Sequence, residues 1–289
     1  MKQCANLLTF SYLALTASIS FCTTRVEEPY YLDPRHLVPF CHLFLTPGSS
    51  EGLALRFIND IMISETPKMC DVIGFKNDSR PKDPTPKFDV ICIKLNSVRP
   101  AAIIGIQPLR FESTSRKITQ YEVADHYVEQ LEGFEKLDWE KRLLAFRNLV
   151  PVLSILVSHF EPDRMDRLVK HSKMLDTWSY DHLYKGFAVT TMYLDKCRER
   201  VQRDSDVMRD NLDKWCHFFT YANSYRVGEI PAWTKTDDAM KSAYSRLDPR
   251  KYTEEEIKLH NETLKAFETT LADYKKAVEE GRWKPGQLK

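Results

Sequence analysis

The chain has 289 residues, of which 43% are hydrophobic and 29% charged, and this is enough for one sizeable core with or without an accessory lobe. Only 9 Gly and 15 Pro exclude a fibrous or low-complexity chain. Lys and Arg total 42 against 41 Asp and Glu, so the net charge of +1 provides no global attraction to nucleic acid. Any binding of DNA therefore requires a local basic patch.

Seven cysteines are scattered along the chain, with no C-x-x-C pair and no zinc-like spacing: Cys4, Cys22, Cys41, Cys70, Cys92, Cys197 and Cys216. An odd number without regular spacing argues against a disulfide framework. Cysteine usage therefore favours a reducing, cytoplasmic compartment.

The N-terminal segment, in contrast, favours export from the cytoplasm. Lys2 precedes an apolar stretch over residues 7–21 that contains the small residues Ser18 and Ser20. This pattern is typical of a signal peptide over residues 1–22, and the alternative is an upstream extension or a buried N-terminal helix. The stretch is too short for a transmembrane helix, so we expect no membrane span in the mature chain. The protein is exported if residues 1–22 are a true signal.

Two helices and a strand are predicted in the first part of the folded chain. Asp33 is the expected N-cap of a short helix that has Pro34 at its first position and ends near Phe44. Residues 52–63 are typical of a second helix, and residues 69–75 of a short strand. One side of the second helix is apolar, with Leu53, Phe57 and Ile61.

A hairpin follows a polar loop. Residues 88–95 and 101–107 are nearly continuous apolar runs separated by a short turn, which favours an antiparallel pair of strands. With the turn centred near Val98, Asp89 is expected opposite Gln107, within a residue or two. Gly105 and Gln107 are expected on the same face because side chains alternate along a strand.

The second half is predicted to be mixed and then helical. Residues 116–131 indicate a helix that ends near Gly133, residues 149–157 a buried central strand, and residues 187–194 a further strand. Residues 206–221 indicate a helix with Trp215 and Phe219 on one side.

The clearest helix begins at a capping box formed by Thr253 and Glu256, and Gly281 is its natural stop. Its apolar residues have the spacing of a short heptad seam. Packing against the parent domain is the favoured interpretation, and a homodimer is the alternative.

Short motifs also follow one another in a definite order: Asp33, Phe40, Leu43-Phe44, Phe57-Ile58-Asn59, Asp89-Val90, Gly105-Ile106-Gln107, Phe111, Arg116, Tyr121, Gln130-Leu131, Gly133, Pro151-Val152, Tyr193-Leu194-Asp195-Lys196, Trp215 and Glu279-Glu280-Gly281. In this order the chain resembles the recombination-promoting nuclease family, transposase-associated proteins of the PD-(D/E)-x-K group. The resemblance implies an α/β fold of the restriction-endonuclease type over residues 30–225, with a mixed central sheet flanked by helices. A helical C-terminal lobe over residues 226–289 follows, and residues 134–148 and 162–182 fit poorly, as insertions would.

The resemblance also implies a site for cutting DNA phosphodiesters with Mg²⁺. Asp89 takes the place of the metal ligand on one strand, and Gln107 the place of the third catalytic group on the next, while Arg116 and Lys117 are implied contacts to DNA. The catalytic Glu position is occupied by Gly105. Since glycine has no side-chain ligand and the ion supplies several kcal/mol of transition-state stabilisation, we expect nuclease activity to be absent or very weak.

Two other interpretations of Asp89, Gly105 and Gln107 remain open. A neighbouring carboxylate, Glu112 or Asp33, can fill the gap left by the missing Glu. Asp89 and Gln107 can also be no more than the first and last residues of two strands. The alternative function is a non-enzymatic interaction protein that reuses the fold and is exported if residues 1–22 are a true signal.

Other motifs point to weaker alternatives. Residues 48–52 match G-x-S-x-G, the nucleophile elbow of serine hydrolases, with Ser50 as the nucleophile. Residues 196–203 contain Lys196, Arg198, Arg200 and Arg203, a mixed basic stretch that can contact phosphate or form a solvated face. No P-loop, dinucleotide-binding glycine motif or close pair of metal-binding histidines is present in the sequence.

Overall fold

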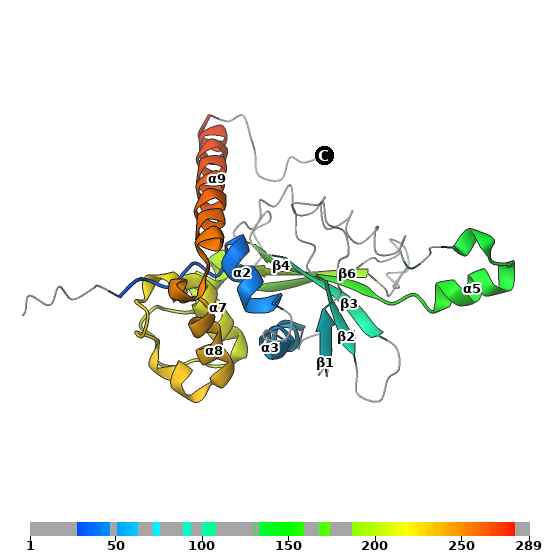
Figure 1. The fold of residues 1–289 in the computed structure, drawn as a ribbon, viewed down its shortest axis with the longest axis horizontal. Coiled ribbons are helices and arrows are strands. Elements are labelled where there is room, and N and C mark those ends of the chain that lie inside the picture. Colours follow the sequence, from blue (N-terminus) through cyan, green and yellow to red (C-terminus); the bar gives the residue numbers. More distant parts are fainter. Residues whose placement is uncertain are drawn as a thin grey trace, which may run out of the picture.

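A computed structural model of the chain describes residues 28–46, 51–62, 72–75, 89–93, 100–107, 130, 133–158, 168–173 and 187–280. These residues form a mixed sheet with helices packed on it (Figure 1). The predicted α/β class, with a mixed sheet flanked by helices, is therefore confirmed.

The sheet has six strands in the order β1 (Val72–Phe75), β2 (Asp89–Ile93), β3 (Pro100–Gln107), β4 (Val152–Ser158), β6 (Phe187–Tyr193) and β5 (Val169–Lys173). β1, β2 and β3 are antiparallel neighbours, β3, β4 and β6 are parallel, and β5 runs antiparallel to β6 at the edge. The predicted hairpin of β2 and β3 is confirmed. β4 is buried along its whole length, as a central strand of β-branched and aliphatic residues should be.

Two helices precede the sheet, α2 (Leu37–Phe44) and α3 (Glu51–Met62). The prediction that Asp33 caps α2 is wrong, because His36 is the N-cap residue and Asp33 instead accepts hydrogen bonds from the backbone and guanidinium of Arg35. Pro39 is tolerated because it lies in the first turn, where its missing N–H has no intrahelical partner to lose.

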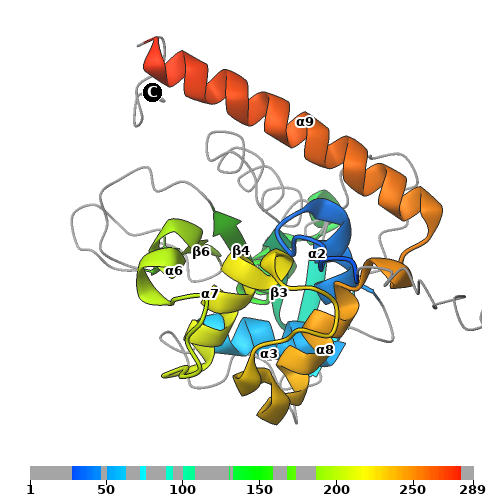
Figure 2. The same ribbon diagram turned by 90° about the vertical axis from the view of Figure 1, so that its left-hand side faces the viewer.

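The C-terminal region is helical. It contains α6 (Leu194–Arg200), α7 (Asn211–Tyr221), α8 (Asp238–Arg246) and α9 (Glu254–Glu279), with 3-10 turns at Ala222–Ser224, Ala232–Thr236 and Pro249–Lys251 (Figure 2). α7 begins later than predicted because Asp210 caps it, accepting a hydrogen bond from the backbone N–H of Asp213. The strand predicted over residues 187–194 is β6, which ends at Tyr193, and Leu194 begins α6.

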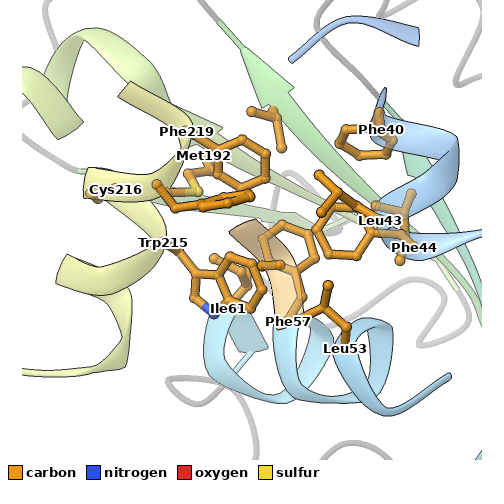
Figure 3. Close-up of a cluster of buried hydrophobic side chains, with 14 of the residues drawn as sticks. Phe40, Leu43, Phe44, Leu53, Phe57, Ile61, Met192, Trp215, Cys216 and Phe219 are labelled. Atoms are coloured by element: carbon orange, nitrogen blue, oxygen red, sulfur yellow. The ribbon is translucent and has the colours of Figure 1, made fainter. Parts of the chain in front are cut away.

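One aromatic core joins the sheet to these helices. α2 contributes Phe40 and Phe44, α3 contributes Phe57, and α7 contributes Trp215 and Phe219 (Figure 3). Phe44 and Phe57 stack with ring centroids 4.8 Å apart, and Trp215 meets Phe57 edge-to-face at 4.9 Å. The same core continues into α8. The predicted nuclease-like domain (residues 30–225) and the predicted helical lobe (residues 226–289) therefore share one core.

Among the described elements that were not predicted are one helix and one strand in the middle of the chain. The helix α5 (Trp139–Arg147) follows a 3-10 turn at Phe134–Lys136 and projects beyond the sheet at the end opposite to α7 and α8 (Figure 1). Trp139, the first residue of this helix, is 75% exposed. The edge strand β5 is the other element, and both lie in the segments that fitted the family poorly. The helix predicted over residues 116–131 falls outside the described residues apart from helical Gln130.

α9 begins with the predicted capping box, which is confirmed. The Thr253 backbone N–H donates to Glu256 Oε2 at 2.8 Å, and the Glu256 backbone N–H donates to Thr253 Oγ1 at 3.2 Å. From there α9 extends past the other described helices (Figure 2). Within the described ranges, no helix combines the length and the apolar character needed to cross a membrane.

Candidate functional site

The candidate site lies where four neighbouring strands align. Asp89 at the start of β2 is the register partner of Gly105 in β3, Gly105 is the partner of Ser154 in β4, and Ser154 is the partner of Val189 in β6. Asp89 was expected opposite Gln107 within a residue or two, and it lies opposite Gly105, two residues away, so the expectation is confirmed within that range. A small shift of the hairpin turn is sufficient for this difference.

This row occupies the face of the sheet away from the aromatic core. Ile104 and Ile106, on either side of Gly105, are fully buried in the core shared with α2, α3 and α7. Because neighbouring residues of a strand point to opposite faces, the Gly105 position belongs to the other face, together with Asp89 and Ser154. Gln107 belongs to that face too, one step along β3 beside Leu156.

Ser154 is a polar residue in an apolar strand that sequence inspection did not single out. Its side chain is 3% exposed, and its Oγ has no hydrogen-bond partner in the described structure. A buried hydroxyl without a partner costs free energy, typically about 1 to 3 kcal/mol. Ser154 is the direct register partner of Gly105 in the neighbouring strand, so a buried hydroxyl adjoins that position.

The residue types in this row do not fit tight Mg²⁺ binding. Mg²⁺ prefers hard oxygen ligands, usually one or more carboxylates, and the row supplies a single carboxylate at Asp89, an amide at Gln107 and no ligand at Gly105. Among the residues that the structure describes, no three His, Cys, Asp or Glu side chains are grouped as a metal site. We therefore derive no catalytic step through a metal ion.

Asp33 does not fill the gap. Its carboxylate is bound by the Arg35 guanidinium and also accepts a hydrogen bond from Asn223 Nδ2 at 3.3 Å. Burial raises the pKa of Asp33, but the hydrogen bonds and charge of Arg35 outweigh this and lower it below its usual value. Its two oxygens therefore have partners already. Glu112, Arg116 and Lys117 lie outside the described residues.

The serine-hydrolase alternative loses its structural context. A nucleophile elbow lies between a strand and a helix. The apolar run before residues 48–52 is the helix α2, so the motif joins two helices rather than a strand and a helix. Ser50 itself lies outside the described residues.

The basic stretch over residues 196–203 is largely neutralised within the protein. Lys196 Nζ lies 3.1 Å from Glu199 Oε2, and Arg200 forms ion pairs with both Asp210 and Asp213. Arg203 donates to the carbonyl oxygen of Ser224 at 3.0 Å. Guanidinium groups with such partners attract phosphate weakly, so this stretch is better explained as a braced connection between α6 and α7.

The buried thiols are poor nucleophiles. Burial raises the pKa of the Cys41 thiol to about 12. Burial also raises the pKa of Cys197 well above its ordinary value, and the neighbouring Cys216 thiol adds to this effect. Because the thiolate is the reactive form, neither residue has the character of a catalytic cysteine.

A buried carboxylate at Asp60 has a structural role that sequence inspection missed. Asp60 accepts hydrogen bonds from Arg56 Nε at 2.6 Å, Asn211 Nδ2 at 3.0 Å and Trp215 Nε1 at 3.0 Å. These contacts join α3 to α7. The available sequence signal was a charged residue beside Ile61 on a helix whose apolar side packs into the core, but such a signal identifies no partner.

Comparisons with known proteins identify no relative. No family model matches the chain, and neither a characterised protein nor a solved structure matches it.

Proposed function

We propose that this chain is a catalytically degenerate member of the recombination-promoting nuclease family, with a restriction-endonuclease-like core that binds DNA and cuts it weakly or not at all. One observation carries the proposal. Asp89 and Gly105 are direct partners on neighbouring strands, as the metal-binding Asp and Glu of such a nuclease are expected to be, and the Glu is the residue that is missing.

Further support comes from the architecture. The sheet is mixed, helices pack on it, and the two poorly fitting segments contain α5 and the edge strand β5 outside the β2–β3–β4 core. Ser154 beside Gly105 keeps the same region polar. Metal-assisted cleavage of DNA needs more than one carboxylate ligand, and this row has a single carboxylate. The row is therefore consistent with a protein that binds nucleic acid without hydrolysing it efficiently.

The test uses the purified full chain with linear and supercoiled DNA. We expect DNA binding that weakens steeply as salt rises, because phosphate contacts release counterions. We also expect no Mg²⁺-dependent cleavage above that of the Asp89→Ala variant. Strong cleavage that Asp89→Ala abolishes would show that the protein is an active nuclease, and absence of salt-sensitive binding would remove the DNA role.

The second candidate is an exported, non-enzymatic interaction protein that reuses this fold. The observation that favours it is the neutralisation of Lys196 and Arg200 by acidic partners, which removes a basic patch from this part of the surface. It predicts a secreted chain processed after the signal-like segment, with no affinity for DNA. Mass spectrometry of the mature N-terminus, together with the binding assay, separates the two.

A further inference from the structure

α9 is held against α2 by two separate contacts. The first is at its opening turn, where His42 Nε2 in the last turn of α2 lies 2.7 Å from Glu256 Oε1. The His42 ring also stacks on Tyr252, with ring centroids 4.2 Å apart. We call this contact the clasp.

The second contact lies further along α9. The ring of His36, the N-cap residue of α2, meets the ring of His260 edge-to-face at 5.7 Å and that of Phe267 at 5.6 Å. His260 and Phe267 are two turns apart on one side of α9, so His36 is seated between them. We call the His36–His260 contact the latch.

The latch is buried and polar. His260 is 5% exposed, and its Nδ1 has no hydrogen-bond partner among the described residues. The charged groups around the latch are Asp33, Arg35 and Glu268, with Asp33 Oδ2 lying 3.6 Å from His36 Nε2. Asp33 is shared with Arg35, so only part of its charge is available to a protonated His36.

We propose that the His36–His260 latch is an acid-sensitive device, which holds α9 against α2 when both rings are neutral and releases the part of α9 beyond His260 when they are protonated. Two cations in contact repel each other, and burying a second charge at this site costs further free energy. The clasp remains closed during this release, so α9 swings about its first turn as a hinged arm.

The direction of the effect follows from the surroundings of the two rings. Burial lowers the pKa of His36, and the charge of Arg35 adds to this, while Asp33 and Glu268 partly oppose it. Burial also lowers the pKa of His260, and His36 adds to it against Asp33. A histidine with a lowered pKa disfavours its protonated form in the docked state, so docking is most stable above the ordinary histidine value of about 6.5 and weakens as pH falls below it.

The clasp responds differently. The hydrogen bond from His42 and the capping bond from Thr253 lower the pKa of Glu256 below its ordinary value of 4.5. Glu256 therefore remains charged over the range in which the latch histidines gain protons. As pH falls below about 6.5 the latch weakens while the first turn of α9 stays attached.

Hydrogen–deuterium exchange of the full chain tests the proposal, with rates corrected for the effect of pH on chemical exchange. A helix without tertiary packing is marginal in water, so release lowers the backbone protection of residues 261–279. We expect about a tenfold loss of this protection between about pH 7.5 and pH 5.5, while residues 254–258 keep theirs. Equal protection of residues 261–279 at the two pH values would overturn the proposal.

Two variants locate the cause. His260→Phe keeps an aromatic contact to His36 but places no second charge there, so we expect the acid-induced loss to disappear. His36→Phe is the matched variant from the α2 side and should have the same effect if the two rings act as a pair. Each variant must still unfold cooperatively at neutral pH. If such a variant loses as much protection in acid as the wild type does, the acid response comes from other groups.

Discussion

Asp89 in β2 and Gly105 in β3 are direct cross-strand partners, and Ser154 in β4 continues the same row. The neighbours Ile104 and Ile106 fix which face this row occupies, because both are buried in the aromatic core. A residue introduced at position 105 therefore points to the face of Asp89. In the proposed function, Gly105 takes the place of the second carboxylate of a metal-binding pair.

Gly105→Glu is expected to create Mg²⁺ binding. The variant places a second carboxylate beside Asp89, and a metal that binds only the folded state stabilises it. At Mg²⁺ concentrations ten times the Kd, the free energy of unfolding should rise by about 1.4 kcal/mol. Urea unfolding with and without Mg²⁺ measures this change.

Gly105→Gln is the matched control for that experiment, because it has nearly the same shape and no charge. It should show no Mg²⁺-dependent stabilisation, and neither should Gly105→Glu combined with Asp89→Ala. Equal responses of the Glu and Gln variants would contradict the proposed pairing of positions 89 and 105.

Asp60→Ala is expected to destabilise the fold by about 3 kcal/mol, because it leaves buried hydrogen-bond donors without an acceptor. The donors are Asn211 Nδ2 and Trp215 Nε1 on α7, and Arg56 loses its partner on α3. Chemical denaturation measures the change. Asp238→Ala removes a carboxylate that is 98% exposed and should leave stability unchanged. An equal effect of the two substitutions would show that the buried network contributes little.

Local signals made much of this fold predictable. The Thr253–Glu256 capping box, the β2–β3 hairpin and the apolar strand β4 each depend on neighbouring residues in the chain, and all three are confirmed. The pairing of Asp89 with Gly105 was predicted only within a residue or two. Register depends on the turn geometry, and a small error there moves every pair along the ladder.

The remainder depends on contacts between residues far apart in sequence. Asp33 is a residue type that favours the N-cap and precedes a proline, but its carboxylate is bound by Arg35. His36 takes the N-cap position without a side-chain capping bond. β5 is an edge strand with Lys170 and His171 in its middle, so it lacks the apolar pattern of a buried strand. The acceptor role of Asp60 was equally invisible, because two of its donors lie about 150 residues further along the chain.

Asp213→Asn is expected to weaken the protein at neutral pH and to matter progressively less in acid. Burial raises the pKa of Asp213, but hydrogen bonds from Arg209 and Arg200 outweigh this and hold it below the ordinary value of 3.8. A carboxyl with a lowered pKa stabilises the fold above its unfolded value and loses this contribution as pH falls through the folded one. We expect a loss of about 2 to 3 kcal/mol at pH 7, which shrinks below about pH 4.

Urea unfolding of both proteins across this pH range measures the difference. Asp138→Asn is the control, since Asp138 forms an exposed pair with Lys141 and its replacement should change stability little at any pH. A difference between wild type and Asp213→Asn that stays constant from neutral pH to below pH 4 would exclude the charge of Asp213 as its cause.

Thr253→Ala is expected to loosen the start of α9 without unfolding the domain. It removes the Oγ1 that accepts the Glu256 backbone N–H, and loss of an N-cap costs about 1 kcal/mol, or about fivefold in local opening. Hydrogen–deuterium exchange of residues 254–260 at neutral pH measures this change. Thr269→Ala is the matched control, because Thr269 Oγ1 donates to the Lys265 carbonyl within the helix, away from the first turn. If both substitutions change protection at residues 254–260 equally, the capping box does not anchor α9. If only Thr253→Ala does, the capping box holds the first turn of α9.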